Sequence, residues 1–108
     1  NKNKMEIIKD YHNRNIRFTD DRKDHIEQDH PEMLNQYDKI KDTLKSPFMI
    51  IRSKTDNDVE LFYKKYSRTP VTEKYLCVVI KSRIEDSFII TAYFTDTIKK
   101  GEIVWEKK

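Results

Sequence analysis

The residues of this chain that are best suited to acid–base chemistry are two histidines, His25 and His30, in an acidic segment. His25 lies four residues from both Asp21 and Asp29, so in a helix its imidazole shares one face with two carboxylates. Neighbouring carboxylates favour the charged imidazole, which suits a general acid or base near neutral pH. His25 is therefore a catalytic candidate. The ordinary structural alternatives are a solvated surface histidine and, for His30, a helix-end residue that binds the last carbonyls.

A second set of candidates comes from the stretch Asp86–Trp105, in which a strand-like run is followed by a basic turn. Side chains alternate along a strand, so one face of this run is apolar and the other carries hydroxyls. The apolar face holds Phe88, Ile90, Ala92 and Phe94, and the other face holds Ile89, Thr91, Tyr93 and Thr95. Two lysines and Gly101, the only glycine, come next in the sequence. This order predicts that the strand hydroxyls and the lysines form the floor of an anion site.

Further cations and tyrosines are candidates for binding a phosphate group. The substrate-binding set that we predict is Arg52, Tyr63, Lys65, Lys99 and Lys100. Phe62, Tyr63 and Tyr66 interleave with lysines, a mixture that stacks bases while it tracks a phosphate backbone. The structural alternative for each lysine is a solvated sheet edge, and for Thr91 it is a hydroxyl chosen for strand propensity.

Other kinds of site are excluded or disfavoured by what the chain lacks. A single glycine rules out glycine-rich phosphate loops and dinucleotide fingerprints, and no Gly-x-Ser-x-Gly motif is present. Cys77 lies within a core-strand run, where a nucleophile would lack access. His25 and His30 are five residues apart and face different ways on a helix, so we predict no metal and no cofactor. The remaining imidazole, hydroxyl and cationic groups fit metal-independent cleavage of RNA.

Length and composition indicate one domain of 108 residues. The net charge of +3 is modest, but residues 1–44 carry 9 basic and 10 acidic side chains, whereas residues 45–108 carry 13 and 9. The basic excess therefore lies in the half that contains the predicted strands. No apolar window of about 18 residues exists, which excludes a transmembrane helix, and no signal-peptide pattern opens the chain. A single cysteine favours a reducing compartment, so we predict a cytoplasmic protein without a membrane partner.

The elements that must position these residues are two helices followed by four strands. Thr19 with Asp20 and Asp21 predicts a helix over Asp20–Asp29, which ends near His30 because Pro31 disfavours helical geometry before it. A second helix is expected at Glu32–Leu44, with Met33, Tyr37, Ile40 and Leu44 on one stripe. Strands are expected at Phe48–Ile51, Val59–Tyr66, Tyr75–Lys81 and Phe88–Phe94. Short polar connections favour antiparallel neighbours, so we predict an α+β fold with two N-terminal helices packed on a four-stranded antiparallel meander.

The predicted domain spans residues 16–108, and residues 1–15 are an N-terminal extension whose order is left open. Within that extension, Met5–Ile8 reads either as a strand or as a helical turn. Ile103 and Trp105 either add a short edge strand or cap the core. If the helices cover the Phe88 face of the last predicted strand, Thr91 and Tyr93 point to the open side, and His25 must reach round an edge to join them.

The order of motifs resembles that of a known nuclease family. The motifs are T-D-D-R-K-D-H-I-E-Q-D-H-P-E-M, then S-P-F-M-I, a Tyr-rich strand, Y-L-C-V-V-I-K and I-I-T-A-Y-F-T-D-T-I-K-K-G-E-I-V-W. Together they are similar to the phage-type barnase, EndoU, colicin and RelE-like nucleases, over about residues 16–105. The spacing of the histidines and the closing I-T-A-Y, K-G and W are the most specific parts.

The resemblance implies a barnase/RelE-like fold and a metal-independent endoribonuclease of toxin-like or phage-associated type. By position, His25 and His30 match the helix histidines, Thr91 and Tyr93 match the strand motif, and Lys100 with Gly101 matches the basic turn. His25 is then the general base or acid, and Arg52 is a second-tier candidate. The implied partners are RNA, including tRNA, and a cognate inhibitor or antitoxin. The alternative is a non-catalytic phage or toxin-system module of the same fold that binds a protein or nucleic acid.

Overall fold

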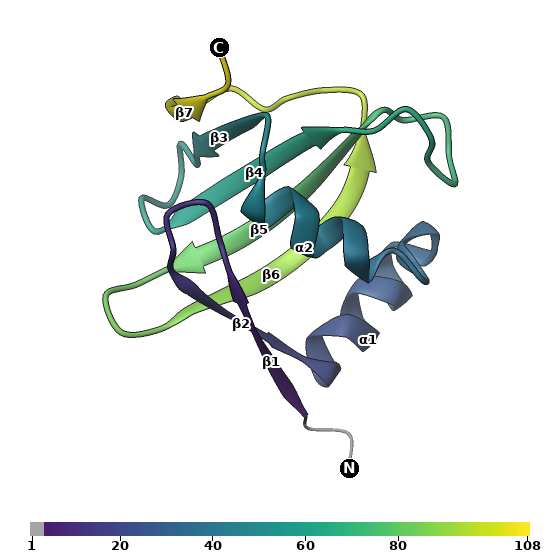
Figure 1. Ribbon diagram of the computed structural model, residues 1–108, viewed down its shortest axis with the longest axis horizontal. Coiled ribbons are helices and arrows are strands. Elements are labelled where there is room, and N and C mark those ends of the chain that lie inside the picture. Colours follow the sequence, from purple (N-terminus) through teal and green to yellow (C-terminus); the bar gives the residue numbers. More distant parts are fainter. Residues whose placement is uncertain (1–3) are drawn as a thin grey trace.

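The computed structural model describes residues 4–108, which form two α-helices and a seven-stranded mixed sheet (Figure 1). The elements in chain order are β1 (Met5–Lys9), β2 (Asn15–Thr19), α1 (Asp20–Asp29), the 3-10 turn η1 (Pro31–Met33), α2 (Tyr37–Lys45), β3 (Met49–Arg52), β4 (Val59–Lys65), β5 (Tyr75–Ser82), β6 (Ser87–Thr95) and β7 (Glu102–Glu106). The order of strands across the sheet is β1-β2-β6-β5-β4-β3-β7. All neighbouring strands are antiparallel except β2 and β6, which are parallel.

The predicted fold of two helices on a four-stranded antiparallel meander, described as barnase/RelE-like, is therefore wrong. The four predicted strands correspond to β3, β4, β5 and β6, but β1 and β2 extend the sheet at one edge and β7 extends it at the other. These three strands are only five residues long, and Ile8 is the one buried residue of β1, so their apolar alternation is weak. The parallel β2–β6 pairing spans only two residue pairs and has no local sequence signal.

The first helix has the bounds predicted for it, and the local sequence explains both ends. Thr19 is the N-cap, and its side-chain oxygen accepts a hydrogen bond from the backbone N–H of Arg22 at 3.1 Å. At the other end, the backbone N–H of His30 donates to the carbonyl of Ile26 at 2.7 Å, and Pro31 begins a separate turn. The chain therefore changes direction at His30.

The second predicted helix, Glu32–Leu44, is interrupted in the structure. Residues Pro31–Met33 form the 3-10 turn, Asn35 has a positive φ of 65°, and α2 begins only at Tyr37. Asparagine tolerates this left-handed conformation better than most residues, so it ends one helical segment before the next begins. Met33, Ile40 and Leu44 of the predicted stripe are nevertheless fully buried, because both segments face the same core.

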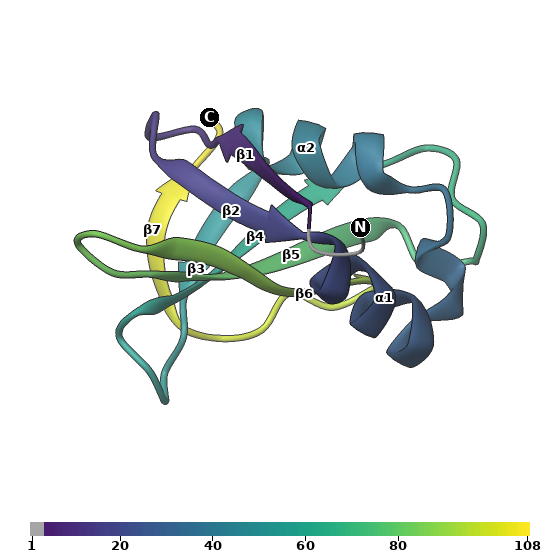
Figure 2. The same ribbon diagram turned by 90° about the horizontal axis from the view of Figure 1, so that it is seen from below.

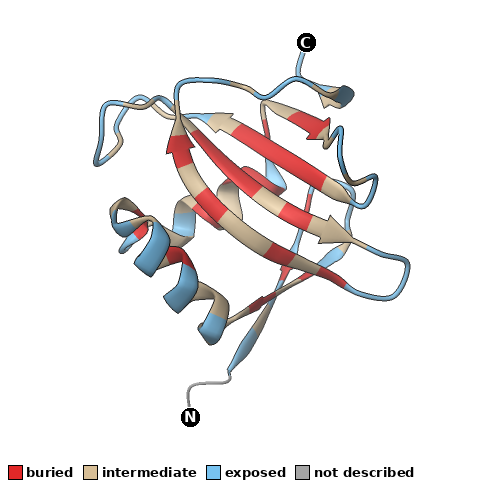
Figure 3. Cartoon of the chain, turned by 180° about the vertical axis from the view of Figure 1, so that it is seen from behind, coloured by how far each residue is buried: buried red, intermediate tan, exposed pale blue. Residues whose placement is uncertain are grey.

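The two helices and the strand β1 leave one face of the central strands open. α2 packs against β1, β4 and β5, and Figure 2 shows α2 and β1 on the same side of the central strands. α1 and η1 instead contact β6, beside the part of that strand that β2 does not reach. Figure 3 shows the opposite face of β4, β5 and β6, with α1 beside it and no helix over it. None of the helices described is long and apolar enough to cross a membrane.

The larger core lies between the sheet and the helices, and a smaller cluster lies on the open face. Phe18, Ile26, Ile40, Phe62 and Ala92 belong to the larger core. The smaller cluster consists of Ile51, Leu61, Tyr63 and Cys77, with Met49, Val59, Tyr75, Val79, Tyr93 and Ile98 packed against it. Ile98 belongs to the β6–β7 connection, so this connection covers part of the open face.

A β-bulge in β6 changes which residues share a face. Val79 of β5 pairs with Thr91, but the next residue, Ile80, pairs with Ile89, so Ile90 has no partner in that register. Ile89 is consequently in the helix-side core with Ala92 and is not on the face of the hydroxyl residues. The prediction that placed Phe88 and Ile90 on the apolar face with Ala92, and Ile89 on the other face, is wrong for this reason. Thr91 keeps its predicted place on the open side.

Candidate functional site

A cavity of about 390 Å³ lies on the open face of the sheet, beneath the β6–β7 connection. It is lined by Ser53, Lys54, Thr55, Val59, Leu61, Val79, Thr91, Tyr93, Lys99 and Lys100. Four of these, Thr91, Tyr93, Lys99 and Lys100, are residues that the sequence singled out, and the structure brings them together. The strand β6 supplies the two hydroxyls, and the connection that follows supplies the two lysines. We refer to this cavity as the open-face cavity.

Two features hold the lysine-bearing connection against the sheet. The hydroxyl of Tyr63 accepts a hydrogen bond from the backbone N–H of Lys99 at 3.1 Å. Gly101 passes so close to β3 that an added Cβ would lie 2.7 Å from the Cγ2 of Ile51 and still closer to the carbonyl oxygen of Arg52. Tyr63 was predicted to bind substrate, but its side chain is completely buried. The structure therefore gives Tyr63 a positioning role beneath the connection.

The acidity of the buried groups decides what they can do at this cavity. Burial, with a further contribution from the neighbouring Cys77, raises the pKa of Tyr93 far above its ordinary value. Its phenol is therefore protonated at neutral pH and can donate a hydrogen bond or a proton. Burial also raises the pKa of the Cys77 thiol to about 11, and Cys77 has no exposed surface. A thiol in this state is not a nucleophile.

Of the two histidines, His30 is the one placed next to the open-face cavity. Its ring centroid is 5.4 Å from that of Tyr93, with an angle of 31° between the ring planes. Its Nδ1 lies 3.8 Å from a carboxylate oxygen of Glu32, so the imidazole lies between a tyrosine and a carboxylate. This position follows from the end of α1 at His30 and from the packing of α1 and η1 against β6.

His25 lies elsewhere on α1 and is exposed. Among residues 4–108, it makes no side-chain hydrogen bond or ion pair, so the predicted pairing with Asp21 and Asp29 is not formed. It shares a helix face with Arg22, three residues before it. Arg22 lines a small cavity of about 170 Å³ with Arg17, Thr19, Phe88 and Ile89, at the start of β6. The structure therefore does not bring His25 into contact with Thr91 or Tyr93.

Arg52 and Lys65 are also outside the open-face cavity. The guanidinium of Arg52 donates to Glu102 at 2.7 Å and lies 4.0 Å from Glu60, so it is held between two carboxylates. Lys65 is exposed at the end of β4 and lines a different cavity. The sequence could not show that Arg52 and Lys65 lie outside the cavity while Lys99 lines it, because all three are cationic residues at or near the ends of predicted strands.

The predicted stacking of bases on Phe62, Tyr63 and Tyr66 is contradicted by their burial and bonding. Phe62 and Tyr63 have no exposed surface. The hydroxyl of Tyr66 donates to a carboxylate oxygen of Asp42 at 2.8 Å, which ties that ring to α2. Because side chains alternate along β4, Phe62 points into the helix-side core and Tyr63 points into the open-face cluster. Neither of these two rings is free to contact a ligand.

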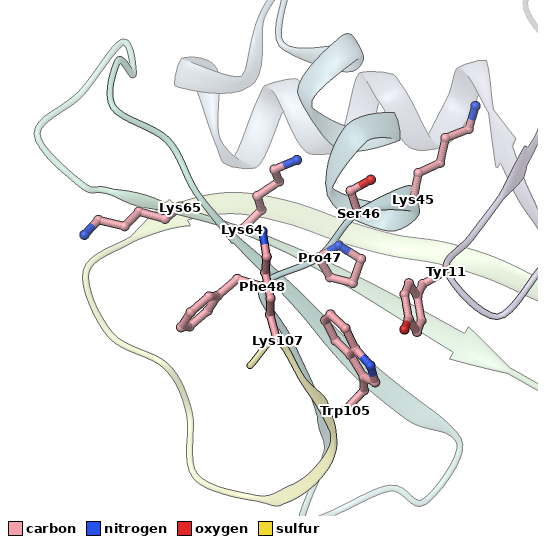
Figure 4. Close-up of a pocket in the computed structure, with 9 residues that line it drawn as sticks. All are labelled: Tyr11, Lys45, Ser46, Pro47, Phe48, Lys64, Lys65, Trp105 and Lys107. Carbon is pink, nitrogen blue, oxygen red and sulfur yellow. The ribbon is translucent and has the colours of Figure 1, made fainter.

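A second cavity, of about 400 Å³, was not predicted from the sequence (Figure 4). Its lining residues are Tyr11, Lys45, Ser46, Pro47, Phe48, Lys64, Lys65, Trp105 and Lys107. They come from the β1–β2 turn, the end of α2, the α2–β3 connection, β4, β7 and the residue after β7. Only the three-dimensional arrangement brings these segments together. The sequence does place Lys64 and Lys65 beside aromatic residues. Those neighbours are Phe62, Tyr63 and Tyr66, however, and none of them lines the cleft. We refer to this cavity as the Trp105 cleft.

The open-face cavity combines hydroxyl and ammonium groups that suit a phosphate. Lys54, Lys99 and Lys100 form no ion pair with any residue that the structure describes, so their charges are available to an anion. Within residues 4–108, no three His, Cys, Asp or Glu side chains are grouped so that they could hold a metal ion. Comparisons with family models, curated proteins and solved structures give no match for this chain.

Proposed function

We propose that this protein is a metal-independent endoribonuclease whose active site is the open-face cavity. The observation that carries the proposal is the convergence of Thr91, Tyr93, Lys99 and Lys100 on one cavity, with the imidazole of His30 against Tyr93. Hydroxyl and ammonium groups bind a phosphodiester, and an imidazole next to them can transfer protons at neutral pH. RNA as the substrate is inferred only from the order of sequence motifs that resembles the barnase, EndoU, colicin and RelE-like nucleases, because the observed sheet differs from the fold that this resemblance implies.

The reaction needs one proton acceptor, one proton donor and a cationic pocket. The ribose 2′-oxygen forms a bond to phosphorus while the bond from phosphorus to the 5′-oxygen breaks, which leaves a 2′,3′-cyclic phosphate. A base removes the proton of the 2′-hydroxyl, and an acid protonates the 5′-oxygen. Lys99 and Lys100 stabilise the charge that develops on the phosphorane oxygens. Thr91 donates a hydrogen bond to the same oxygens.

The imidazole of His30 is the proposed base, and Tyr93 is the proposed acid. A protonated phenol of high pKa gives up a proton only as negative charge develops on its partner, which is the situation at the departing 5′-oxygen. His25 was the first choice from the sequence. The assignment moves to His30 because the ring of His30 lies against Tyr93. We further propose that the protein acts on RNA in the cytoplasm and that a cognate inhibitor or antitoxin protein restrains it.

The decisive experiment incubates purified protein with a labelled RNA in the presence of EDTA. We expect cleavage with cyclic phosphate or 3′-phosphate ends. Because general acid–base catalysis contributes about 10²- to 10⁴-fold, His30→Ala should lower kcat by a factor in this range, and Tyr93→Phe should do the same. Lys74→Ala is the control, because Lys74 is exposed and lines neither cavity. His25→Ala, on the first-choice histidine, tests whether the second imidazole takes part.

Two results would reject parts of this proposal. Cleavage that requires a divalent metal ion would reject the mechanism, and full activity of His30→Ala together with an inactive His25→Ala would reject the assignment of the base. A second candidate function is a non-catalytic module that binds a protein or nucleic acid. It is favoured by the presence of only one imidazole at the open-face cavity. RNA that remains intact but bound would support this second function.

A further inference from the structure

We propose that the Trp105 cleft is a binding site for single-stranded RNA, separate from the open-face cavity. The two cavities share no lining residue. The ring of Trp105 packs against the helix-side core, whereas Tyr93 packs against the cluster on the open face. This inference extends the proposed ribonuclease function but needs no turnover, because it concerns binding alone.

The aromatic part of the cleft can stack an unpaired base. The ring centroids of Tyr11 and Trp105 are 4.4 Å apart, with an angle of 41° between their planes. Figure 4 shows the rings of Tyr11, Pro47 and Trp105 grouped together, with the ring of Phe48 turned away on the other side of Pro47. Tyr11 is 43% exposed, and Trp105 is partly exposed, so both can contact a ligand. Every base has an aromatic face, so such a site accepts any unpaired nucleotide.

The charges around the cleft suit a phosphate backbone. Four lysines line it, and within the described part of the chain only Lys64 forms an ion pair, with Asp42 at 2.8 Å. Lys45, Lys65 and Lys107 are exposed. Figure 4 shows Lys45 and Lys65 extending away from the cleft in different directions. A backbone that enters on one side and leaves on the other can therefore meet an ammonium group at each end.

The backbone hydrogen bonds around the cleft fix its shape before a ligand binds. The N–H of Tyr11 donates to the carbonyl of Leu44 at 2.8 Å, which ties the β1–β2 turn to the end of α2. The N–H of Phe48 donates to Tyr63 at 2.7 Å, and the N–H of Lys107 donates to Phe48 at 3.0 Å. Binding to a preformed site costs less ordering entropy than binding to a mobile one.

Single-stranded RNA fits these features better than an acidic protein does. An acidic peptide would satisfy the lysines but would leave the exposed faces of Tyr11 and Trp105 without a planar partner. A duplex would satisfy the lysines too, but its bases are already stacked on one another. An unpaired nucleotide uses the rings and the ammonium groups together.

The chain contains one tryptophan, so its fluorescence reports directly on this cleft. The test titrates the full chain with a 2′-O-methyl oligouridine of about ten nucleotides, which spans a typical single-strand site and has no free 2′-hydroxyl to react. We expect the fluorescence of Trp105 to be quenched as the anisotropy of a labelled oligonucleotide rises. A 2′-O-methyl duplex of the same length should bind at least about tenfold more weakly, because its bases cannot stack on the rings.

A pair of matched double variants separates the cleft from general electrostatic attraction. In Lys45→Glu with Lys107→Glu, two exposed lysines of the cleft change sign. Lys9→Glu with Lys74→Glu makes the same change in net charge at exposed positions that line neither cavity. We expect the cleft variant to bind about tenfold or more weakly than the control, with a salt slope reduced by about 1.4 for two lost phosphate contacts.

Three outcomes would overturn the inference. They are binding without quenching of Trp105, equal affinity in the two double variants, and quenching by an oligoglutamate as strong as that by the oligonucleotide. The last outcome would assign the cleft to an acidic protein. Failure of the ribonuclease proposal remains distinguishable, because an intact RNA that still quenches Trp105 supports this site without any cleavage. Conversely, RNA cleavage without quenching would reject this site alone.

Discussion

Cys77 shows how burial sets the chemistry of a single residue beside the open-face cavity. Burial raises the pKa of its thiol to about 11, and the folded state therefore favours the protonated form. Because the folded pKa lies above the unfolded pKa, this contribution to stability is fully present below about pH 9 and is lost as the pH rises through about 11. The thiol is thus kept neutral throughout the pH range in which histidine titrates.

We predict that Cys77 is unreactive in the native protein and unnecessary for cleavage. Two pKa units lower the thiolate fraction about 100-fold, so a disulfide reagent at pH 8 should label the native protein at least about 100-fold more slowly than the protein unfolded in urea. Cys77→Ala should cleave RNA at close to the wild-type rate. Fast labelling of the native protein, or loss of activity in a folded Cys77→Ala variant, would contradict this account.

At the scale of elements, the features that could be predicted were those that depend on only a few consecutive residues. Thr19 and Pro31 set the two ends of α1, and alternation placed Thr91 and Tyr93 on one face of β6. The bulge at Ile90 could not be predicted, because it depends on how β5 and β6 pair and not on the residues of β6 alone. The break at Asn35 was also missed. The apolar residues on both sides of Asn35 fit one continuous helical stripe, and this pattern hid the left-handed residue that interrupts the helix.

The β6–β7 connection depends on Gly101, which gives a test at this scale. Gly101→Ala places a methyl group against the backbone of Arg52 and the side chain of Ile51, neither of which can move without shifting β3. We expect a loss of about 1–3 kcal/mol in the free energy of unfolding, measured by circular dichroism in urea. RNA cleavage should fall as well, because Lys99 and Lys100 precede the displaced residue.

The control for this variant is Ser67→Ala, at an exposed position in the β4–β5 connection. That change should leave both the free energy of unfolding and the cleavage rate within the error of the wild-type values. If Gly101→Ala proves as stable and as active as Ser67→Ala, the connection does not need the close approach to β3 that the structure shows.

At the scale of the whole molecule, the sequence could not predict which distant segments meet. The Trp105 cleft joins the β1–β2 turn to the far end of the chain, and the edge strands that make this possible carry little apolar signal. His30 reaches Tyr93 only because β2 pairs with the start of β6 and directs α1 along the rest of that strand. Tertiary pairing of this kind leaves no local pattern, so the candidate site could be predicted as residues but not as a constellation.

A buried ionic network links the N-terminal turn to the central strands. The guanidinium of Arg14 donates to Asp10 at 2.9 Å, to Glu60 at 2.7 Å and to the hydroxyl of Ser82 at 2.8 Å. The side chain of Asp10 has no exposed surface, and that of Glu60 is 8% exposed. Burial alone would lower the pKa of Arg14, but the bonds to the two carboxylates outweigh it and raise that pKa. The network therefore holds β1 and β2 on the sheet.

We predict that removing Arg14 destabilises the whole molecule far more than removing a surface arginine. Arg14→Ala leaves the buried carboxylate of Asp10 without a cationic partner and leaves Glu60 with only Arg52, at 4.0 Å, which should cost about 3–5 kcal/mol in the free energy of unfolding. Arg17→Ala removes an exposed pair with Asp86, whose side chains are 37% and 52% exposed, and should cost less than about 1 kcal/mol. Urea unfolding followed by the fluorescence of Trp105 measures both variants.

Because the network fixes the turn that carries Tyr11, Arg14→Ala should also weaken oligonucleotide binding at the Trp105 cleft, whereas Arg17→Ala should not. Similar unfolding energies for the two variants would show that the N-terminal hairpin is held by its apolar contacts alone.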